Sequence, residues 1–201
     1  MAKVDYKKEL KHLYAASAKA PVMVEVPAMQ FAMIDGEGDP NTSEAFQEAM
    51  GCLYGISYTL KFMLKAEGHD WTVMPAEGLW WSDDMDDFVS GNKDGWQWTL
   101  MIMQPDVVTE AHYQAAVAQL REKKDPPGLE KLRFETFGEG LSAQIMHIGP
   151  YADEAPTIEA LHAFIEADGK QRRGKHHEIY LGDPRRTKPE KLKTVVRQPV
   201  A

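Results

Sequence analysis

The chain has 201 residues, of which 43% are hydrophobic and 27% charged, so it can form one large domain or two small fused ones around a buried core. No apolar run approaches about 18 residues, which argues against a membrane-spanning helix. The N-terminus lacks an apolar signal segment, and a lone Cys52 excludes an intrachain disulfide or a cysteine zinc site. We therefore expect a cytoplasmic protein.

The charge is unevenly spread. Residues 170–201 contain ten Lys and Arg against three Asp and Glu, a net charge of +7, whereas the rest of the chain carries −15. A basic tail raises the question of nucleic acid. No helix-turn-helix, zinc finger or interleaving of basic and aromatic residues accompanies it, and the acidic body repels phosphates. We expect no nucleic-acid partner and no membrane partner.

The first half of the chain predicts strands around one long helix. The expected elements are a short amphipathic helix at 3–16, strands at 22–26 and 29–35, and a helix from about 41 to 65. Asn41 is the expected N-cap of the long helix, with Glu44 in a capping-box position. Tyr54, Tyr58 and Phe62 form an aromatic stripe beside its core face. Because each tyrosine hydroxyl needs a partner, a pocket wall explains this stripe better than plain packing does.

A tryptophan-rich hairpin follows, with strands predicted at 77–81 and 96–104. Alternation places Trp96, Trp98, Leu100 and Ile102 on one face of the second strand, and Met101 on the other. The connecting loop, residues 82–95, holds five aspartates but lacks the oxygen spacing and central glycine of a calcium-binding EF-hand. We interpret it as a solvated loop.

The second half predicts a helix at 109–124, strands at 132–137 and 141–148, and a further helix capped by Asp153. The last two strands are His176–Leu181 and Lys193–Pro199. In the first of these, a period of two places Glu178 and Tyr180 on one face and His177 on the other. Glu178 is then either a polar anchor in an apolar pocket or a residue of a strand with one wet face.

The order strand, Gly/Pro break, helix, strand, strand, Gln-Pro occurs at 29–105 and again at 143–199. This repetition predicts an α+β fold of two duplicated units with antiparallel sheets, related by a pseudo-two-fold and leaving a ligand groove between the halves. The expected division is an N-terminal helix and arm at 1–28 and a domain at 29–201. Its two repeats span about 29–105 and 129–201, with a connecting helix at 109–124.

Several segments resemble the GyrI-like small-molecule-binding family. They are 7–10, 31–39, Gly149-Pro150-Tyr151, Glu178-Ile179-Tyr180 with Asp183-Pro184, and the tail 189–200. The resemblance implies the duplicated architecture and makes Glu178 the central pocket glutamate, which in drug-sensing relatives faces cationic aromatic ligands. Residues 1–28 are too short for the DNA-binding headpiece of those bacterial regulators. A stand-alone subgroup that the chain resembles includes hydrolases of cyclopropane-bearing, DNA-alkylating natural products, which implies a role in xenobiotic resistance.

The remaining chemistry is that of one carboxylate among aromatic rings. His176, His177 and Glu178 are consecutive in a strand and cannot all ligate one ion, so we expect no metal, and no motif indicates a cofactor. We predict a monomer or homodimer that binds a hydrophobic, polycyclic aromatic molecule and, in the enzymatic alternative, hydrolyses it. A protein-interaction or drug-sequestering module is the other alternative. The predicted catalytic residues are Glu178, Tyr58 and Tyr180, and the predicted ligand-binding residues are Tyr54, Trp80, Trp81, Trp96, Trp98, Met101 and His147.

Overall fold

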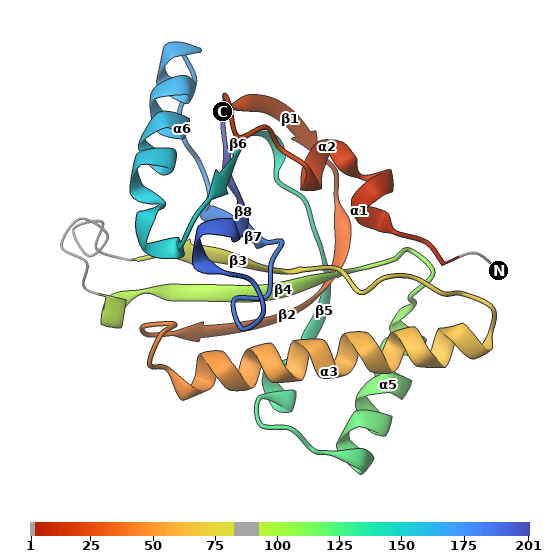
Figure 1. Ribbon diagram of the computed structural model, residues 1–201. Helices are drawn as coiled ribbons and strands as arrows, with labels where there is room; N and C mark the ends of the chain where they lie inside the picture. The colour runs from red at the N-terminus through yellow and green to blue at the C-terminus, as the bar shows by residue number, and fades with distance from the viewer. Residues whose placement is uncertain (1–2, 83–92) are drawn as a thin grey trace. The chain divides into compact units, whose positions relative to one another are not determined.

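The computed structural model describes residues 3–82 and 93–201, whose helices and strands are labelled in Figure 1. The chain divides into two compact units. Unit 1 comprises Met1–Asp5 and Met29–Phe137, and unit 2 comprises Tyr6–Ala28 and Gly138–Ala201. Each unit combines an antiparallel sheet with helices, which confirms the predicted α+β class. Among the described residues, no helix is both long and apolar enough to cross a membrane.

The described strands of unit 1 pair in the order β3-β4-β2-β5. They are β2 (Met29–Glu37), β3 (Ala76–Trp81), β4 (Gln97–Gln104) and β5 (Arg133–Phe137). The helices are α3 (Glu44–Ala66) and α5 (Glu110–Lys123), with short 3₁₀ turns η1 (Lys93–Gly95) and η2 (Leu129–Lys131). Helix α3 packs along β2 and β4, and α5 packs against α3 (Figure 1).

Helix α3 begins later than the sequence predicts. Its N-cap is Ser43, whose Oγ accepts a hydrogen bond from the backbone N of Phe46 at 3.2 Å. The predicted cap, Asn41, was wrong: Asn41 lies in the preceding turn, where its side-chain Nδ2 donates to Asp39 Oδ1 at 2.7 Å. The helix predicted at 109–124 is α5, and Thr109, its N-cap, forms a capping box with His112.

The hairpin β3-β4 is buried on both faces. Trp98 is 1% exposed and lies across from Trp80 on β3 and Gly36 on β2. Phe46 of α3 packs on both indoles, with ring centroids 5.4 Å from Trp98 and 5.9 Å from Trp80. The absence of a side chain at Gly36 makes room for the Trp98 ring.

The described strands of unit 2 pair in the order β1-β6-β8-β7. They are β1 (Val22–Val26), β6 (Gly140–Ile148), β7 (His176–Tyr180) and β8 (Lys193–Pro199). The helices are α1 (Tyr6–Glu9), α2 (Lys11–Tyr14) and α6 (Ala155–Ala167), with 3₁₀ turns η3 (Tyr151–Asp153) and η4 (Pro189–Lys191). The single helix predicted at 3–16 is therefore two short helices.

Both units use the same chain order. The succession β2-α3-β3-β4 in unit 1 matches β6-α6-β7-β8 in unit 2, as the internal repeat predicted. In each unit one further strand, β5 or β1, pairs with the edge of the first strand of that succession. The predicted pseudo-two-fold and groove stay predictions.

Helix α6 covers one face of the unit 2 sheet. Its Leu161 and Ile165 are fully buried and pack with Ile145 of β6 and Val196 of β8. The strand register places side chains of β7 on this same face, because Glu178 lies across from Val196 and Tyr180 from Thr194. The face thus changes from apolar beneath α6 to polar along β7.

The opposite face of the sheet holds a buried network of charged groups. Glu139, 3% exposed, accepts from Arg197 Nη1 at 3.3 Å, and its Oε2 lies 2.9 Å from His177 Nδ1. Arg197 also donates to Gln144 Oε1 at 3.0 Å and to the Leu13 carbonyl at 2.8 Å. This network ties together the turn before β6, the three strands β6, β7 and β8, and helix α2.

The fit of Trp98 over residue 36 predicts a stability difference between two glycine substitutions. In Gly36→Ala, the new Cβ would lie 2.1 Å from Trp98 Cη2, so the ring or strand must shift. We expect the free energy of unfolding to fall by about 1–3 kcal/mol. Gly51→Ala on α3 is the control, because a Cβ at residue 51 meets nothing within 4 Å. This substitution should raise the free energy of unfolding by roughly 0.5–1 kcal/mol, since alanine favours a helix more than glycine does. Urea unfolding measures both; equal effects would contradict this packing.

The buried network predicts that Glu139→Gln costs about 3–5 kcal/mol, because Arg197 would then be buried without its counter-ion. Burial acts to raise the pKa of Glu139, but His177 and Arg197 hold it below the ordinary 4.5. An acid with a depressed pKa adds stability above its unfolded pKa and loses that contribution as pH falls through the folded pKa. Wild type should therefore lose stability in acid more steeply than the variant.

Chemical denaturation across acidic pH measures this difference. Glu130→Gln is the matched control, because the ion pair of Glu130 with Arg121 is 2.7 Å long but Glu130 is 84% exposed. It should cost less than about 1 kcal/mol. A loss for Glu139→Gln as small as that of the control would show that the network is not stabilising.

Candidate functional site

Three polar side chains of β7 meet on the face that α6 covers. They are His176, Glu178 and Tyr180, which alternation places on one side of the strand. His176 Nε2 lies 3.1 Å from Glu178 Oε1, and the Tyr180 hydroxyl donates to Glu178 Oε2 at 2.9 Å. Both carboxylate oxygens therefore have a partner. The structure brings the predicted pair Glu178 and Tyr180 together and adds His176, which the metal argument had set aside.

The environment keeps Glu178 ionised. Its side chain is 16% exposed, and this burial acts to raise its pKa. The hydrogen bonds with His176 and Tyr180, together with the electrostatic effect of His176, outweigh burial and hold the pKa of Glu178 below its ordinary value. The result is a largely buried carboxylate that is held by His176 and Tyr180.

Glu154 is a second carboxyl group at this site. It is 4% exposed, and its Oε1 is buried without a hydrogen-bond partner among the described residues. Burial, and then repulsion by Glu178, raise the pKa of Glu154 to about 9. Glu154 is therefore a neutral acid at neutral pH, beside an ionised one.

The sequence reasoning missed Glu154. It predicted Asp153 as the cap of α6, and this was wrong: the N-cap position is Glu154, whose side chain makes no capping hydrogen bond. The available signal was weak. Ser, Thr, Asp and Asn are the usual N-cap residues, so a glutamate just before the helical Ala155-Pro156 is unusual.

His147 lies near this cluster in the sheet register, across from Thr194. Its Nδ1 is 2.9 Å from Thr157 Oγ1 and its Nε2 is 3.2 Å from the Pro150 carbonyl. Both ring nitrogens thus join β6 to the start of α6. The predicted role of His147 in ligand binding stays a prediction.

The other predicted site residues belong to unit 1, where some are buried in the core and the others are exposed or partly exposed. Trp80, Trp98 and Met101 are at most 4% exposed and lie in its core. Tyr58 is 47% exposed and Phe62 is 61% exposed. The remaining predicted residues, Tyr54, Trp81 and Trp96, are partly exposed.

The aromatic stripe on α3 is a ladder of rings. Tyr58 is 6.5 Å from Tyr54 and 6.2 Å from Phe62 between ring centroids. The rings of Tyr58 and Phe62 are stacked and those of Tyr54 and Tyr58 are tilted, in the row that the spacing of four residues predicted. The predicted pocket wall stays a prediction. Its contact with a ligand, and that of the tryptophans, stay predictions.

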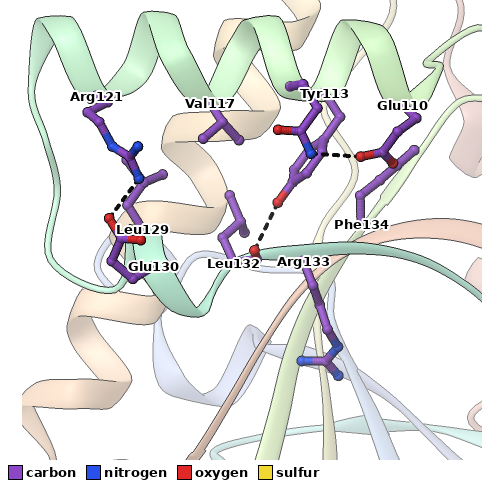
Figure 2. A pocket seen from close by; sticks show the side chains of 10 residues that line it. Glu110, Tyr113, Val117, Arg121, Leu129, Glu130, Leu132, Arg133 and Phe134 are labelled. Carbon is purple, nitrogen blue, oxygen red and sulfur yellow. Dashed lines mark hydrogen bonds and ion pairs between the residues drawn. The ribbon is translucent and has the colours of Figure 1, made fainter.

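Figure 2 shows a hollow of about 430 Å³ between α5 and the segment 129–134. Its floor is apolar and includes Val117, Leu129 and Leu132. Some of its polar groups bond to one another: Tyr113 donates to the Leu132 carbonyl, and Arg121 pairs with Glu130. None of the predicted site residues lines this hollow, which is separate from the Glu178 cluster.

In residues 3–82 and 93–201, no group of three or more His, Cys, Asp or Glu side chains is placed to hold a metal ion. Cys52 is buried, and burial raises the pKa of its thiol to about 11, so it packs as an apolar residue. Most of the acidic loop, at 83–92, lies outside the described residues.

The family model for GyrI-like small molecule binding domains matches residues 19–201. The chain belongs to this family. A conserved protein from Listeria innocua is 40% identical to this GyrI-like domain, with a TM-score of 0.90 over 99% of this chain and 100% of that one. A hydrolase from Listeria innocua is also 40% identical, with a TM-score of 0.87 over 99% and 100% of the two chains.

A more distant structure, the C-terminal domain of EcmrR, shares the fold. It is 12% identical, with a TM-score of 0.55 over 90% of this chain and 96% of that one. A comparison with curated proteins finds no match.

Proposed function

We propose that this GyrI-like domain binds hydrophobic, polycyclic aromatic molecules beside Glu178 and hydrolyses an electrophilic member of that class. The observation that carries the proposal is the ionised carboxylate of Glu178, mostly buried and held between His176 and Tyr180. Support also comes from the 40% identical hydrolase from Listeria innocua.

The geometry suits the activation of water. A carboxylate that is fixed on a strand can align a water molecule more accurately than one on a loop. It accepts the water proton as the oxygen attacks. Because its pKa is lowered, Glu178 is a weak base, so its best substrate is one whose own strain drives the reaction.

A cyclopropane fused to a cyclohexadienone meets that requirement. The water oxygen bonds to a cyclopropane carbon while the strained C–C bond breaks. The released electron pair makes the ring aromatic and leaves a phenolate on the former carbonyl oxygen. Glu178 takes a proton from the water and returns one to the phenolate, so the product is a phenol that bears an alcohol and no longer alkylates DNA.

A tyrosine is the proposed donor to that oxygen. In the resting protein the Tyr180 hydroxyl donates to Glu178, so its first role is to orient the carboxylate. Tyr58 has an exposed ring and stays the alternative donor. The assignment of Tyr54 and the hairpin tryptophans to ring stacking is part of the same proposal.

The second candidate is capture without hydrolysis. The lowered pKa of Glu178 favours it, because a permanently ionised carboxylate attracts a cationic aromatic ligand whether or not water is activated. A protein-interaction role through the acidic loop concerns residues 83–92, outside those described.

Binding of planar dyes tests the charge of the site. We expect a cationic dye to bind in the micromolar range, and Glu178→Gln to weaken it about tenfold, because a charged contact worth ~1.5–3 kcal/mol is lost. A neutral dye of similar shape should lose little. Calorimetry measures both, with Glu166→Gln on the exposed side of α6 as the control. Equal weakening of both dyes by Glu178→Gln would assign that residue a structural role.

Turnover of a cyclopropane-bearing dienone separates catalysis from capture. We expect Glu178→Gln to lower kcat by about 10²–10⁴, the usual contribution of a general base. Tyr180→Phe removes one hydrogen bond to Glu178 and should cost about tenfold or less. Chromatography of the incubated substrate measures the alcohol product. Conversion by wild type at the buffer rate would exclude hydrolysis of that substrate and leave capture.

A further inference from the structure

We infer that Glu154 and Thr194 together hold one water molecule beside Glu178, and that this is the water that Glu178 activates. The inference rests on the proposed function for the reaction, whereas the water site itself is a property of the folded chain. Glu154 and Thr194 are then positioning residues, because they orient the water and do not take its proton.

Two buried oxygen atoms where α6 meets the unit 2 sheet have no hydrogen-bond partner among the described residues. They are Glu154 Oε1 and Thr194 Oγ1. Glu154 is 4% exposed and Thr194 is fully buried, so bulk solvent reaches neither oxygen. Most buried polar side-chain atoms bond to another protein group or to an ordered water, because an unsatisfied one destabilises the fold. One internal water that contacts both oxygens satisfies them together.

The strand register places Thr194 between two residues of the site. Thr194 of β8 lies across from His147 of β6 and from Tyr180 of β7. Residues that pair across antiparallel strands project from the same face of the sheet. His147 identifies that face, because its Nδ1 is 2.9 Å from Thr157 Oγ1 on α6. The Thr194 hydroxyl therefore faces the start of α6, between the side chains of His147 and Tyr180.

Glu154 stands over Thr194 at the start of α6. Three residues before Glu154, the ring of Tyr151 packs edge-on against that of Tyr180, with the centroids 5.6 Å apart. Three residues after Glu154, the first turn of α6 bonds to His147. This segment thus runs from Tyr180 to His147 with Glu154 at its midpoint, and Thr194 lies between the same two side chains on the sheet. The two unpartnered oxygens therefore lie close together.

Glu178 is within reach of the same water. It lies across from Val196, so Thr194 is its diagonal neighbour on β8 and projects from the same face, a separation that a long side chain spans. The pKa of Glu154 agrees with this placement: burial, and then repulsion by Glu178, raise it to about 9, while Thr194 acts to lower it. The side chain of Glu178 is 16% exposed, so the site opens to a ligand at Glu178.

A water in this position is oriented for attack. Its two protons are directed to two acceptors, Glu178 and Glu154 Oε1, and the Thr194 hydroxyl donates to one of its lone pairs. Each carboxylate oxygen of Glu178 has a second lone pair for this bond. The remaining lone pair of the water forms the C–O bond while the cyclopropane C–C bond breaks and its electrons pass to the dienone oxygen. Glu178 takes one water proton, and the other stays on the product alcohol.

High-resolution crystal structures test the water site without a ligand. In wild type we expect an ordered water within hydrogen-bond distance of Glu154 Oε1 and Thr194 Oγ1. Thr194→Val keeps the shape of the side chain but lacks the hydroxyl, so the water should be lost. Thr194→Ser keeps the hydroxyl and should retain the water, whereas Glu154→Leu, which lacks Oε1, should lose it.

Turnover of a cyclopropane-bearing dienone tests the use of the water. We expect Thr194→Val to lower kcat by about ten- to a hundredfold, because misplacing a reacting group by about 1 Å can cost about 10²-fold. KM should stay within about twofold, because the contacts with the substrate are unchanged. Thr194→Ser should restore kcat. Thr136→Val, at an exposed threonine of β5, is the matched control and should follow wild type. A merely structural role would reduce the amount of folded enzyme without this split between kcat and KM.

The two measurements separate a failure of the proposed function from a failure of the inference. If wild type holds the water but converts the dienone only at the buffer rate, the proposed function fails and the water site stands. If no water contacts Glu154 and Thr194 in wild type, the inference is overturned, and this result requires no variant to fold. If Thr194→Val loses the water but keeps the wild-type kcat, the water is not the nucleophile and the positioning roles are overturned.

Discussion

The buried carboxylate of Glu139 is the group on which the architecture of unit 2 depends. An isolated charge in a protein interior costs several kcal/mol, so Glu139 can be buried only together with Arg197 and His177. Burial of Arg197 in turn requires partners for its other N–H donors. These are Gln144 on β6 and the Leu13 carbonyl of the N-terminal segment. Sheet, turn and N-terminal segment are thus ordered by one set of charges.

The burial of Glu139 also affects the opposite face of β7, which holds Glu178, because neighbouring residues of a strand project to opposite sides. His177 is held by Glu139 on one face of β7, and Glu178, the next residue, projects from the other. A strand whose register is fixed on one side has its other side fixed as well, since a slip of one residue would exchange the two faces. The polar network on one face therefore positions the carboxylate on the other without contacting a ligand.

Local pattern was sufficient to predict the strands and which side chains share a face. The period of two placed Glu178 with Tyr180, and the helical spacing placed the rings of Tyr54, Tyr58 and Phe62 in one row. It was not sufficient for groups whose state depends on distant neighbours. Glu139 stands between two glycines in an apparent solvated turn, yet its partners are 38 and 58 residues away. Glu154 is the N-cap residue of α6, and Glu178, which contributes to its raised pKa, lies on β7.

Two buried glutamates of one unit have opposite charge states, and their neighbours explain why. His177 and Arg197 hold the pKa of Glu139 below its ordinary value, whereas burial, and then repulsion by Glu178, raise the pKa of Glu154 to about 9. Glu178 is a third carboxyl group of this unit, on the face of the sheet on which α6 packs against β6 and β8. Because its oxygens are already bonded to His176 and Tyr180, a ligand that hydrogen-bonds Glu178 must displace one of them or share its oxygen. Because the Tyr180 hydroxyl is one of these two partners, the roles proposed for Glu178 and Tyr180 depend on the same hydrogen bond.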